Sequence, residues 1–307
     1  MSADDMAMKP SFVEKFIGFV DILGFKNMVL EAEKGHGLPL EVILSATNDL
    51  GSDEIRDRYR RRGPSICPQS AKIAPDVDFQ ITQLSDSVLV STEISPAGVI
   101  SLVEHCWQAC FSLLAKGILC RGSIGRGPIF HSGNQFVGSG YQTAIEREKG
   151  VSIFKIDTKE ASTPFIEVDG AVVRYVAEHG DACVKKMFER MVASDGNLTA
   201  IFPFKRLNQR FLINDQFDAD KQIGSLNNIR SWIRELKTKI APLIDQNNPS
   251  AVAKGAHYFR MLDAQLIECD KTEERIEAWR RALARGTKLT DPRVGIPGKV
   301  PRRPPSA

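Results

Sequence analysis

Apolar residues near the start of the chain predict one buried strand followed by helical structure. The strand is expected at Lys15–Leu23, because it contains the continuous apolar run Phe16–Val20, which is consistent with a buried strand. Residues Phe25–Leu50 follow a helical pattern, and the glycines and proline within Lys34–Pro39 predict a break in it. The chain is therefore expected to begin with a strand and a helix in two parts.

A hairpin is predicted next, at Val77–Leu84 and Val88–Thr92. Its turn is expected at Ser85–Ser87, since Ser and Asp side chains bond to nearby backbone groups in tight turns. A helix is expected at Pro96–Lys116, where apolar residues recur at helical spacing. The elements expected after it are a strand at Ile118–Phe130, a helix start at Gly138–Glu148 and a strand at Val151–Ile156.

The predicted order of strand, helix, hairpin, helix, strand, helix and strand indicates an α+β fold with helices on one side of a sheet. Beyond about Gly170 the pattern becomes mainly helical, with helices expected at Ala171–Val192, Asn227–Leu243, Pro249–Glu268 and Lys271–Arg285. The chain is accordingly divided into a tail at 1–14, a sheet domain at 15–165 with a basic insertion at about 51–76, a helical extension at 166–290 and a Pro-rich tail at 291–307 that is expected to be disordered.

Composition and charge are those of an ordinary globular protein. Of the 307 residues, 42% are hydrophobic and 26% are charged, and the net charge of +3 is too small to indicate nucleic-acid binding. The basic run Arg56–Arg62 is expected to be a solvated face. None of the six cysteines forms a CxxC pair, and Cys106 and Cys110 lie in an apolar helical pattern typical of a core. Because Met1–Pro10 has no secretion signal and no apolar run approaches ~20 residues, we expect a reduced, cytoplasmic protein without a membrane span.

Two aspartates are the first candidates for a functional site. Asp21 directly follows the apolar run Phe16–Val20, and Asp86 lies at the tip of the predicted hairpin. The first strand and the hairpin are natural neighbours in a sheet of this order, so the two carboxylates are expected to lie side by side. Close carboxylates repel unless a cation lies between them, and Mg²⁺ is often held by one or two carboxylates together with substrate phosphates. The alternative is that both aspartates only cap a helix and a turn.

The turn that follows Asp21 suits an anionic ligand. Gly24 allows the backbone to come close to a ligand, and the helix expected from Phe25 directs free N–H groups toward an anion. A carboxylate pair beside such a turn is what a nucleoside triphosphate with magnesium requires.

Four segments of the chain resemble, in order, the motifs of class III nucleotidyl cyclases. FVDILGF resembles the first metal-binding motif, and QLSDSVLV resembles the hairpin that carries the second metal-binding aspartate. CRGSIGRGPIF resembles the strand whose arginine meets the triphosphate, and FVGSGYQTAIERE resembles the helix start that carries ribose and transition-state residues. The motifs span Phe16–Glu148 and look closest to those of the bacterial pyrimidine cyclases of the Pycsar anti-phage defence system. The resemblance implies a cyclase-like palm of order βααββαβ, with a mainly antiparallel sheet, as the catalytic domain at 15–165.

The resemblance also implies roles for individual residues. Asp21 and Asp86 match the two metal-binding aspartates, with the carbonyl of Ile22 as a further ligand. Arg121 matches the triphosphate-binding arginine, and bidentate phosphate contact is favourable for this side chain. Gln142 falls where most family members have an asparagine that orients the ribose, and it offers the same amide group one methylene further out.

Two positions depart from the pattern of the adenylyl cyclases. Thr82 replaces a base-reading lysine, which argues against recognition of adenine in the way those enzymes achieve it. Glu146 replaces the transition-state arginine, so a cation is missing where charge builds up. The candidates to replace that arginine are Arg126, Arg147 and Lys149.

The implied reaction converts a nucleoside triphosphate to a 3′,5′-cyclic nucleotide and pyrophosphate, with two Mg²⁺ or Mn²⁺ ions in each active site. Members of this family place the metal-binding aspartates on one subunit and the base and ribose residues on the other, which implies a head-to-tail homodimer. The metal-binding pair would then face four residues of the partner subunit: Thr82, Gln135, Tyr141 and Gln142.

The expected substrate is a pyrimidine nucleotide, with UTP slightly favoured over CTP, and a separate effector protein is expected to read the cyclic product. One alternative is a purine cyclase. Another is a non-catalytic cyclase-homology module that binds nucleotide or a partner. Glu146 favours this module, whereas the presence of both Asp21 and Asp86 favours an enzyme.

Overall fold

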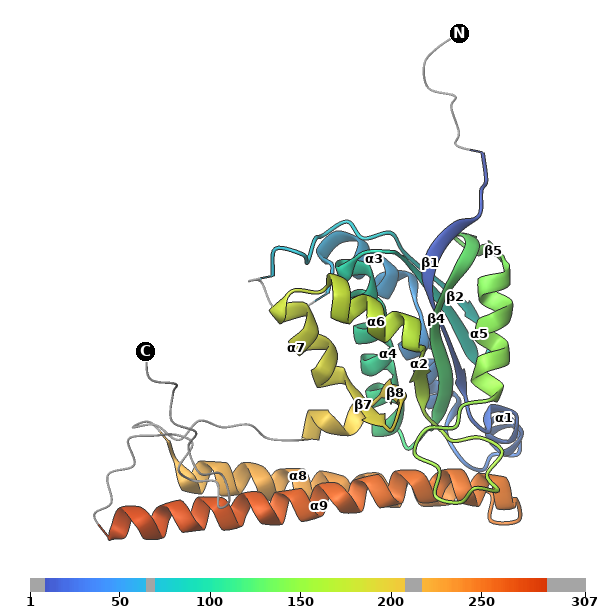
Figure 1. The fold of residues 1–307 in the computed structure, drawn as a ribbon. Helices are drawn as coiled ribbons and strands as arrows, with labels where there is room; N and C mark the ends of the chain where they lie inside the picture. Colours follow the sequence, from blue (N-terminus) through green and yellow to red (C-terminus); the bar gives the residue numbers. More distant parts are fainter. Residues whose placement is uncertain (1–8, 65–69, 208–216, 286–307) are drawn as a thin grey trace, which may run out of the picture.

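An eight-stranded sheet forms the centre of the molecule (Figure 1). The computed structural model describes residues 9–64, 70–207 and 217–285. Along the sheet the strands follow the order β2-β3-β1-β4-β6-β8-β7, and β5 pairs with the end of β4. The strands are β1 Val13–Ile22, β2 Phe79–Leu84, β3 Ser87–Glu93, β4 Cys120–Ser132, β5 Gln135–Val137, β6 Ile166–Val168, β7 Val192–Asp195 and β8 Leu198–Ile201.

Most strand pairs are antiparallel, and among the described residues β4 and β6 form the single parallel pair. The predicted α+β class is therefore confirmed, with a mixed and mostly antiparallel open sheet. The helices are α1 Phe25–Glu33, α2 Leu40–Leu50, α3 Asp53–Arg62, α4 Pro96–Ala115, α5 Ser139–Lys149, α6 Gly170–His179, α7 Ala182–Met191, α8 Ala219–Ile240 and α9 Pro249–Ala284, with short 3-10 helices η1 at Pro203–Leu207 and η2 at Ala241–Leu243.

The elements predicted up to residue 149 are confirmed. The break between α1 and α2 contains Gly35 and Gly37, which both adopt positive φ angles, a conformation that glycine allows at little cost. The hairpin turn lies at Ser85 and Asp86, between β2 and β3. The basic insertion forms the short helix α3, and its Tyr59 is fully buried against Phe79 of β2.

Helices cover both faces of the sheet, so the expectation of helices on one side was wrong. The helices α4, α6 and α7 lie on one face and α5 lies on the other (Figure 1). Close approach of α5 to β4 depends on two glycines, since a Cβ at Gly127 would lie 2.8 Å from the Cα of Gly140. This contact brings the far end of α5, at Glu148, toward the start of β4.

The helix α4 resembles a membrane span in length and composition, but it lies in the core of the protein. Among the described residues α4 is the one helix long and apolar enough to cross a membrane, and 78% of its apolar window is buried inside the protein. Both Cys106 and Cys110 lie in this core, as expected, whereas Cys67 lies outside the described residues.

The segment Val151–Ile156 was predicted as a strand, and this prediction was wrong. Val151 and Ile153 are buried, but the backbone turns here, and the amides of Ser152 and Ile153 donate to the carboxylate of Glu167 at 3.1 and 3.4 Å. The alternating apolar positions therefore reflect packing of a loop. The place beside β4 is taken by β6 instead.

The single helix predicted at Ala171–Val192 is two helices, α6 and α7. Asp181 ends the break between them, because its carboxylate accepts a hydrogen bond from the amide of Val184 at 2.8 Å and so caps α7. The hairpin of β7 and β8 follows at once and adds two strands to the sheet. The segment after Gly170 is thus mainly helical, as predicted, but the prediction missed this hairpin.

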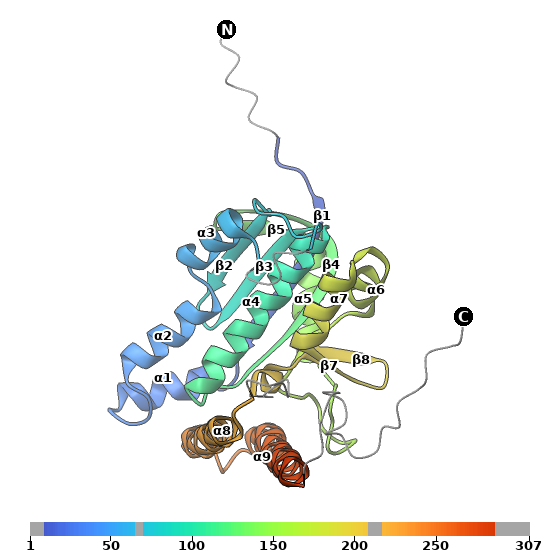
Figure 2. The ribbon, with the colours of Figure 1, turned by 90° about the vertical axis from the view of Figure 1, so that its left-hand side faces the viewer.

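A long helical hairpin of α8 and α9 lies across one end of the sheet (Figure 2). The two helices predicted at Pro249–Glu268 and Lys271–Arg285 are one helix of 36 residues, since the sequence between them holds no glycine or proline to end it. Apolar side chains from both helices, including Ile233, Leu236 and Leu262, pack against the loop that follows α5. The Pro-rich tail at 291–307 and most of the tail at 1–14 lie outside the described residues.

Candidate functional site

The candidate site lies at the end of β1, an inner strand of the sheet between β3 and β4. Asp21 pairs in register with Ser87 of β3 on one side and with Arg121 of β4 on the other. The amide of Ile22 donates to the carbonyl of Asp86 at 2.9 Å. The structure therefore brings together the four residues predicted around the metal and the triphosphate: Asp21, Ile22, Asp86 and Arg121.

The carboxylate of Asp21 lies in a strongly negative environment. Burial raises its pKa, and the neighbouring carboxylates of Asp86 and Glu148 raise it further, to about 7, although Arg121 and Lys254 act in the opposite direction. Ionised Asp21 is thus poorly compensated within the chain. A cation bound at this position would offset that cost.

The alternative that the two aspartates are capping residues does not agree with the local geometry. The residue that caps α1 is Gly24, at φ 74°, and no side chain bonds to the start of this helix. Within the described parts of the chain, neither Asp21 nor Asp86 uses its carboxylate in a hydrogen bond or an ion pair. Two adjacent carboxylates without partners are therefore available to a ligand.

Arg121 is held beside Asp21 by two partners. Its Nε donates to Glu148 Oε1 at 2.5 Å, and its Nη1 donates to Ser162 Oγ at 2.6 Å. The side chains of Arg121 and Glu148 are 14% and 5% exposed, so this ion pair is largely shielded from water. The pair fixes the guanidinium at the same end of the sheet as the two aspartates.

Lys254 is a site residue that the sequence analysis missed. It lies in the second turn of α9, and it is close enough to Asp21, Glu148 and Arg121 to interact electrostatically with all three. In the sequence it resembles any lysine of an amphipathic helix. The one available signal is that it lies four residues before the buried Tyr258, and therefore on the same face of the helix.

The donor set fits a hard divalent cation in part. Among the described residues, no group of three or more His, Cys, Asp and Glu side chains is arranged to hold a metal ion. The predicted site needs fewer protein ligands, because Mg²⁺ commonly binds one or two carboxylates and completes its coordination with waters and substrate phosphates. Asp21 and Asp86, adjacent and without partners, meet that smaller requirement, and the backbone of Ile22 lies directly beside them.

The residues predicted to contact the base and the ribose lie away from Asp21 of the same chain. Gln135 and Gln142 are exposed, on β5 and on the first part of α5. Tyr141 packs on Phe136 and Phe19, with ring centroids 4.8 and 6.3 Å apart. None of these three is grouped with the aspartates, whereas Glu148, at the other end of α5, is.

Thr82 is buried under the end of β4. Its hydroxyl donates to the carbonyl of Gly133 at 2.8 Å, and it lies 2.9 Å from Nε2 of His131. The hydroxyl hydrogen is therefore already used inside the chain. The predicted role of Thr82 in base recognition stays a prediction.

Of the three candidates to replace the missing arginine, two form ion pairs with other residues and one is exposed. Arg147 forms an ion pair with Asp169 at 2.6 Å, and Arg126 forms one with Glu14 at 3.1 Å. Lys149 is exposed at the end of α5.

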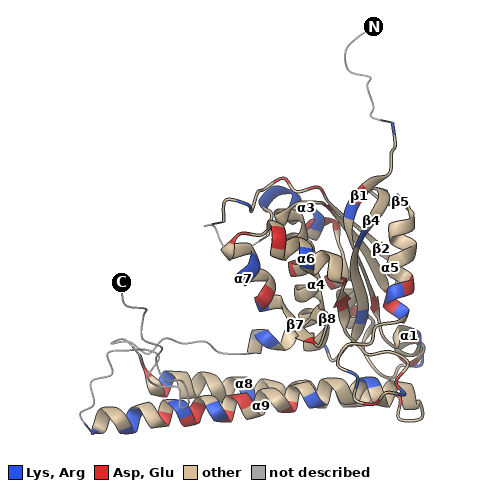
Figure 3. Cartoon of the chain, in the orientation of Figure 1, with Lys and Arg blue, Asp and Glu red and all other residues tan. Residues whose placement is uncertain are grey.

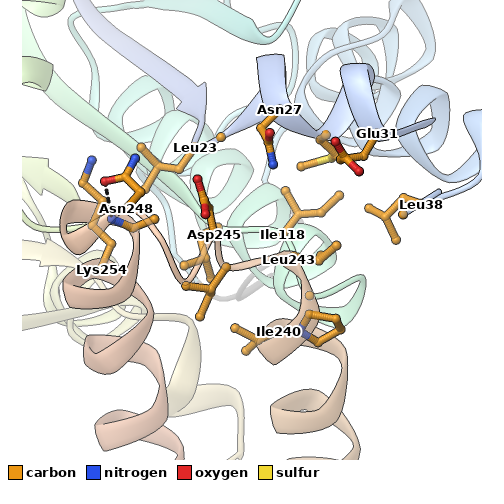
Figure 4. Close-up of a pocket in the computed structure, with 18 of the residues that line it drawn as sticks. Leu23, Asn27, Glu31, Leu38, Ile118, Ile240, Leu243, Asp245, Asn248 and Lys254 are labelled. Atoms are coloured by element: carbon orange, nitrogen blue, oxygen red, sulfur yellow. Dashed lines mark hydrogen bonds between the residues drawn. The ribbon is translucent and has the colours of Figure 1, made fainter. Parts of the chain in front are cut away.

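A pocket of about 440 Å³ adjoins the turn Leu23–Gly24. It lies between α1, the segment that precedes β4, and the start of α9. Figure 4 shows Asn27 and Glu31 on the side of α1, and Asp245, Asn248 and Lys254 on the side of the helical hairpin. Lys254 thus belongs both to this pocket and to the surroundings of Asp21.

Charged residues of both signs alternate along the helical hairpin. Figure 3 shows acidic and basic residues interspersed along α8 and α9. In the basic insertion, Arg56 pairs with Asp53, and Arg58 donates to Gln108 at 3.2 Å. These contacts agree with a structural role for α3.

Comparison with known proteins adds no family assignment. No protein-family model matches the chain, and no curated protein matches it. The interpretation of the site therefore depends on its residues and their arrangement.

Proposed function

We propose that the protein is a nucleotide cyclase that converts a pyrimidine nucleoside triphosphate, UTP somewhat in preference to CTP, to a 3′,5′-cyclic nucleotide and pyrophosphate. The observation that carries the proposal is the pair of carboxylates, Asp21 and Asp86, that lie beside Arg121 at the end of β1 and have no partner among the described residues. Such a pair next to a guanidinium suits a divalent cation and a polyphosphate together. The motif resemblance adds the reaction class and a role as a source of second messenger in anti-phage defence.

The chain's own residues would bind and orient the substrate. Asp21 and Asp86 would hold the divalent cations, together with the carbonyl of Ile22. Arg121 would contact the triphosphate, with its guanidinium oriented by Glu148 and Ser162. When bound, Mg²⁺ or Mn²⁺ would lower the pKa of the ribose 3′-hydroxyl and neutralise phosphate charge. The 3′-oxygen would form a bond to the α-phosphorus as the bond to the pyrophosphate oxygen breaks.

A homodimer with composite sites accounts for the residues that lie away from Asp21. Tyr141 and Gln142 lie in the first turn of α5 and Gln135 lies on β5, and both glutamines are exposed. A second copy would bring its own set of these residues to the aspartates of the first copy. The exposed Val137, 57% accessible, lies on the same surface and agrees with an interface there.

A non-catalytic nucleotide-binding module is the second candidate function. It is favoured by Glu146, which is exposed on α5 where the resemblance expects a transition-state arginine. A module of this kind would bind the nucleotide and metal through the same aspartates but would release no pyrophosphate.

The test is incubation of the protein with each of the four nucleoside triphosphates and Mn²⁺, with measurement of cyclic nucleotide and pyrophosphate. We expect a cyclic pyrimidine nucleotide, and we expect Asp21→Ala and Asp86→Ala to reduce its formation by at least about 100-fold. The melting temperatures should be retained, because the two carboxylates make no contacts that hold the fold together. Asp195→Ala, at an exposed carboxylate on β7, is the matched control and should keep full activity.

Three results would count against the proposal. A purine product would replace the substrate assignment, and nucleotide binding without pyrophosphate release would favour the module. Full activity of either aspartate variant would exclude the two-metal site.

A further inference from the structure

Lys254 on α9 is a half-buried cation beside the candidate metal site. We propose that Lys254 binds the triphosphate together with Arg121, so that the helical hairpin of α8 and α9 contributes to the same half of the active site as Asp21. This inference rests on the proposed cyclase function and adds a residue and an element to it. It also supplies a cation at the site, where Glu146 leaves one missing.

The position of Lys254 is fixed by the packing of α9. Tyr258, one turn further along, is 1% exposed and stacks on Phe165, with ring centroids 6.0 Å apart. Leu262, a further turn along, is fully buried in the same cluster. Residues four apart lie on one face of a helix, so the face that packs on the sheet domain also carries Lys254 toward it.

One loop connects this helix to Arg121. Glu160 lies 3.0 Å from Nε2 of the buried His257 on α9, and Ser162, two residues further along the loop, accepts the hydrogen bond from Arg121. The same short segment thus holds both the guanidinium and the turn of α9 that carries Lys254. The two cations are positioned by one structural unit.

Lys254 lies among carboxylates but makes no direct contact with them. Within residues 9–64, 70–207 and 217–285, its ammonium makes no hydrogen bond or ion pair; burial and the nearby Arg121 lower its pKa, and Glu148 and Asp21 act in the opposite direction. Once divalent ions neutralise the carboxylates, a half-buried ammonium beside a guanidinium is stabilised by a bound anion. A polyphosphate is an anion of sufficient charge and length to contact Arg121 and Lys254 together.

The charges of the site favour binding of a triphosphate together with metal. The three carboxylates Asp21, Asp86 and Glu148 outnumber the two cations Arg121 and Lys254 by one, so the site without metal is negative and repels a polyphosphate. Two divalent ions would make the site positive, and a triphosphate would then offset that charge. The opposite assignment, in which Lys254 only neutralises Asp21, predicts an ion pair between them, and they form none.

The experiment compares Lys254→Ala, Lys254→Arg and the control Lys271→Ala, which removes an exposed lysine of the same helix that pairs with Glu268. Calorimetry with Mn²⁺ measures binding of the α,β-methylene analogues of UTP and CTP, which cannot be cyclised, and of UMP and CMP. We expect Lys254→Ala to weaken binding of the triphosphate analogue by about tenfold or more, with monophosphate binding and the melting temperature unchanged. Lys254→Arg should retain most of the affinity, and Lys271→Ala all of it.

The outcomes separate this inference from the function on which it rests. If the unaltered protein binds the analogue and forms cyclic product but Lys254→Ala binds equally well, Lys254 is no phosphate ligand and the cyclase proposal stands. Equal weakening for monophosphate and triphosphate would mean that α9 only supports the fold of the site. If the unaltered protein binds neither analogue, the proposed function and this inference both fail.

Discussion

At the scale of single residues, buried polar side chains of this chain fall into two kinds: those with hydrogen-bond partners and those without. The carboxylate of Asp21 lies near those of Asp86 and Glu148 and has no hydrogen-bond or ion-pair partner in the described part of the chain, which is typical of a ligand site. His131 is 4% exposed, but it is satisfied on both sides, since Ser91 Oγ lies 2.9 Å from Nδ1 and Thr82 Oγ1 lies 2.9 Å from Nε2. The carboxylate of Asp21 is therefore available to bind a ligand, whereas the ring of His131 stabilises the fold.

The neutral state of His131 leads to a prediction for stability against pH. Burial and, to a smaller extent, the charge of Lys15 lower its pKa to about 4, with Asp78 acting in the opposite direction. The folded pKa lies below the ordinary value of 6.5, so the unfolded chain takes up the proton first as the pH falls. Stability from neutral His131 is therefore complete above about pH 6.5 and is lost toward pH 4.

The quantity to measure is the free energy of unfolding of the unaltered protein minus that of His131→Gln. We expect this difference to be ~2 kcal/mol smaller at pH 4.5 than at pH 7.5. Urea denaturation at the two pH values measures this difference. His36→Gln, at an exposed histidine, is the control and should show no such change. A difference that is independent of pH would mean that the pKa of His131 is the same in the folded and unfolded chains.

At the scale of elements, the long helix α9 is part of the structure of the sheet domain. Leu262 is fully buried with Phe165 and Phe204, which belong to the loop after α5 and to η1. Stacking of Phe111 on α4 against Trp232 on α8, at 5.2 Å, joins the same hairpin to the core helix. The hairpin is therefore expected to unfold together with the sheet.

Leu262→Ala tests this coupling. Removal of a fully buried leucine side chain should lower the free energy of unfolding by about 2–5 kcal/mol in a single transition. Ile267→Ala, on the exposed face of the same helix at 54% accessibility, should lower it much less. Two separate transitions in denaturant, with only one of them shifted by Leu262→Ala, would show that α9 unfolds independently.

At the scale of the whole molecule, the residues assigned to catalysis fall into two sets. Asp21, Asp86 and Arg121 lie at one end of the sheet, and Gln142 lies on the first part of α5, exposed. A two-fold dimer would unite the two sets in each of two sites. The proposed dimer therefore has a consequence that can be measured by mixing variants.

Asp21→Ala and Gln142→Ala are each expected to lose nearly all cyclase activity as homodimers. In a heterodimer of the two, one site carries both substitutions and the other carries neither. With random pairing after co-expression, recovered activity should approach about a quarter of that of the unaltered protein. Asp21→Ala co-expressed with Asp86→Ala is the control and should recover nothing, because both substitutions affect the metal-binding half of the site.

If the first co-expressed pair is as inactive as its parents, each site is built within a single chain. Lys254, which belongs to the same chain as Asp21, would then be one of several residues that complete the site without a partner subunit.

The sequence by itself determined the local structure of the first half of the chain. Strand β1, the broken helix α1–α2, the hairpin β2–β3 and helix α4 follow from apolar periodicity, from glycines at turns and from the Ser-Asp-Ser turn, all of which act between near neighbours. The adjacency of Asp21 and Asp86 was also predictable, because a strand and a following hairpin commonly pair. These features need little information from distant residues.

The tertiary structure alone decided the features that depend on contacts between distant segments. Val151–Ile156 alternates like a strand, but its apolar side chains pack on the helical hairpin and its amides bond to Glu167. The short strands exist because each finds a partner in the sheet: β6 pairs with β4, β8 with β6, and β7 with β8. A three- or four-residue strand has little pattern of its own. Lys254 became a site residue in the same way, because the packing of Tyr258 and Leu262 brings a lysine of α9 beside an aspartate at the opposite end of the sequence.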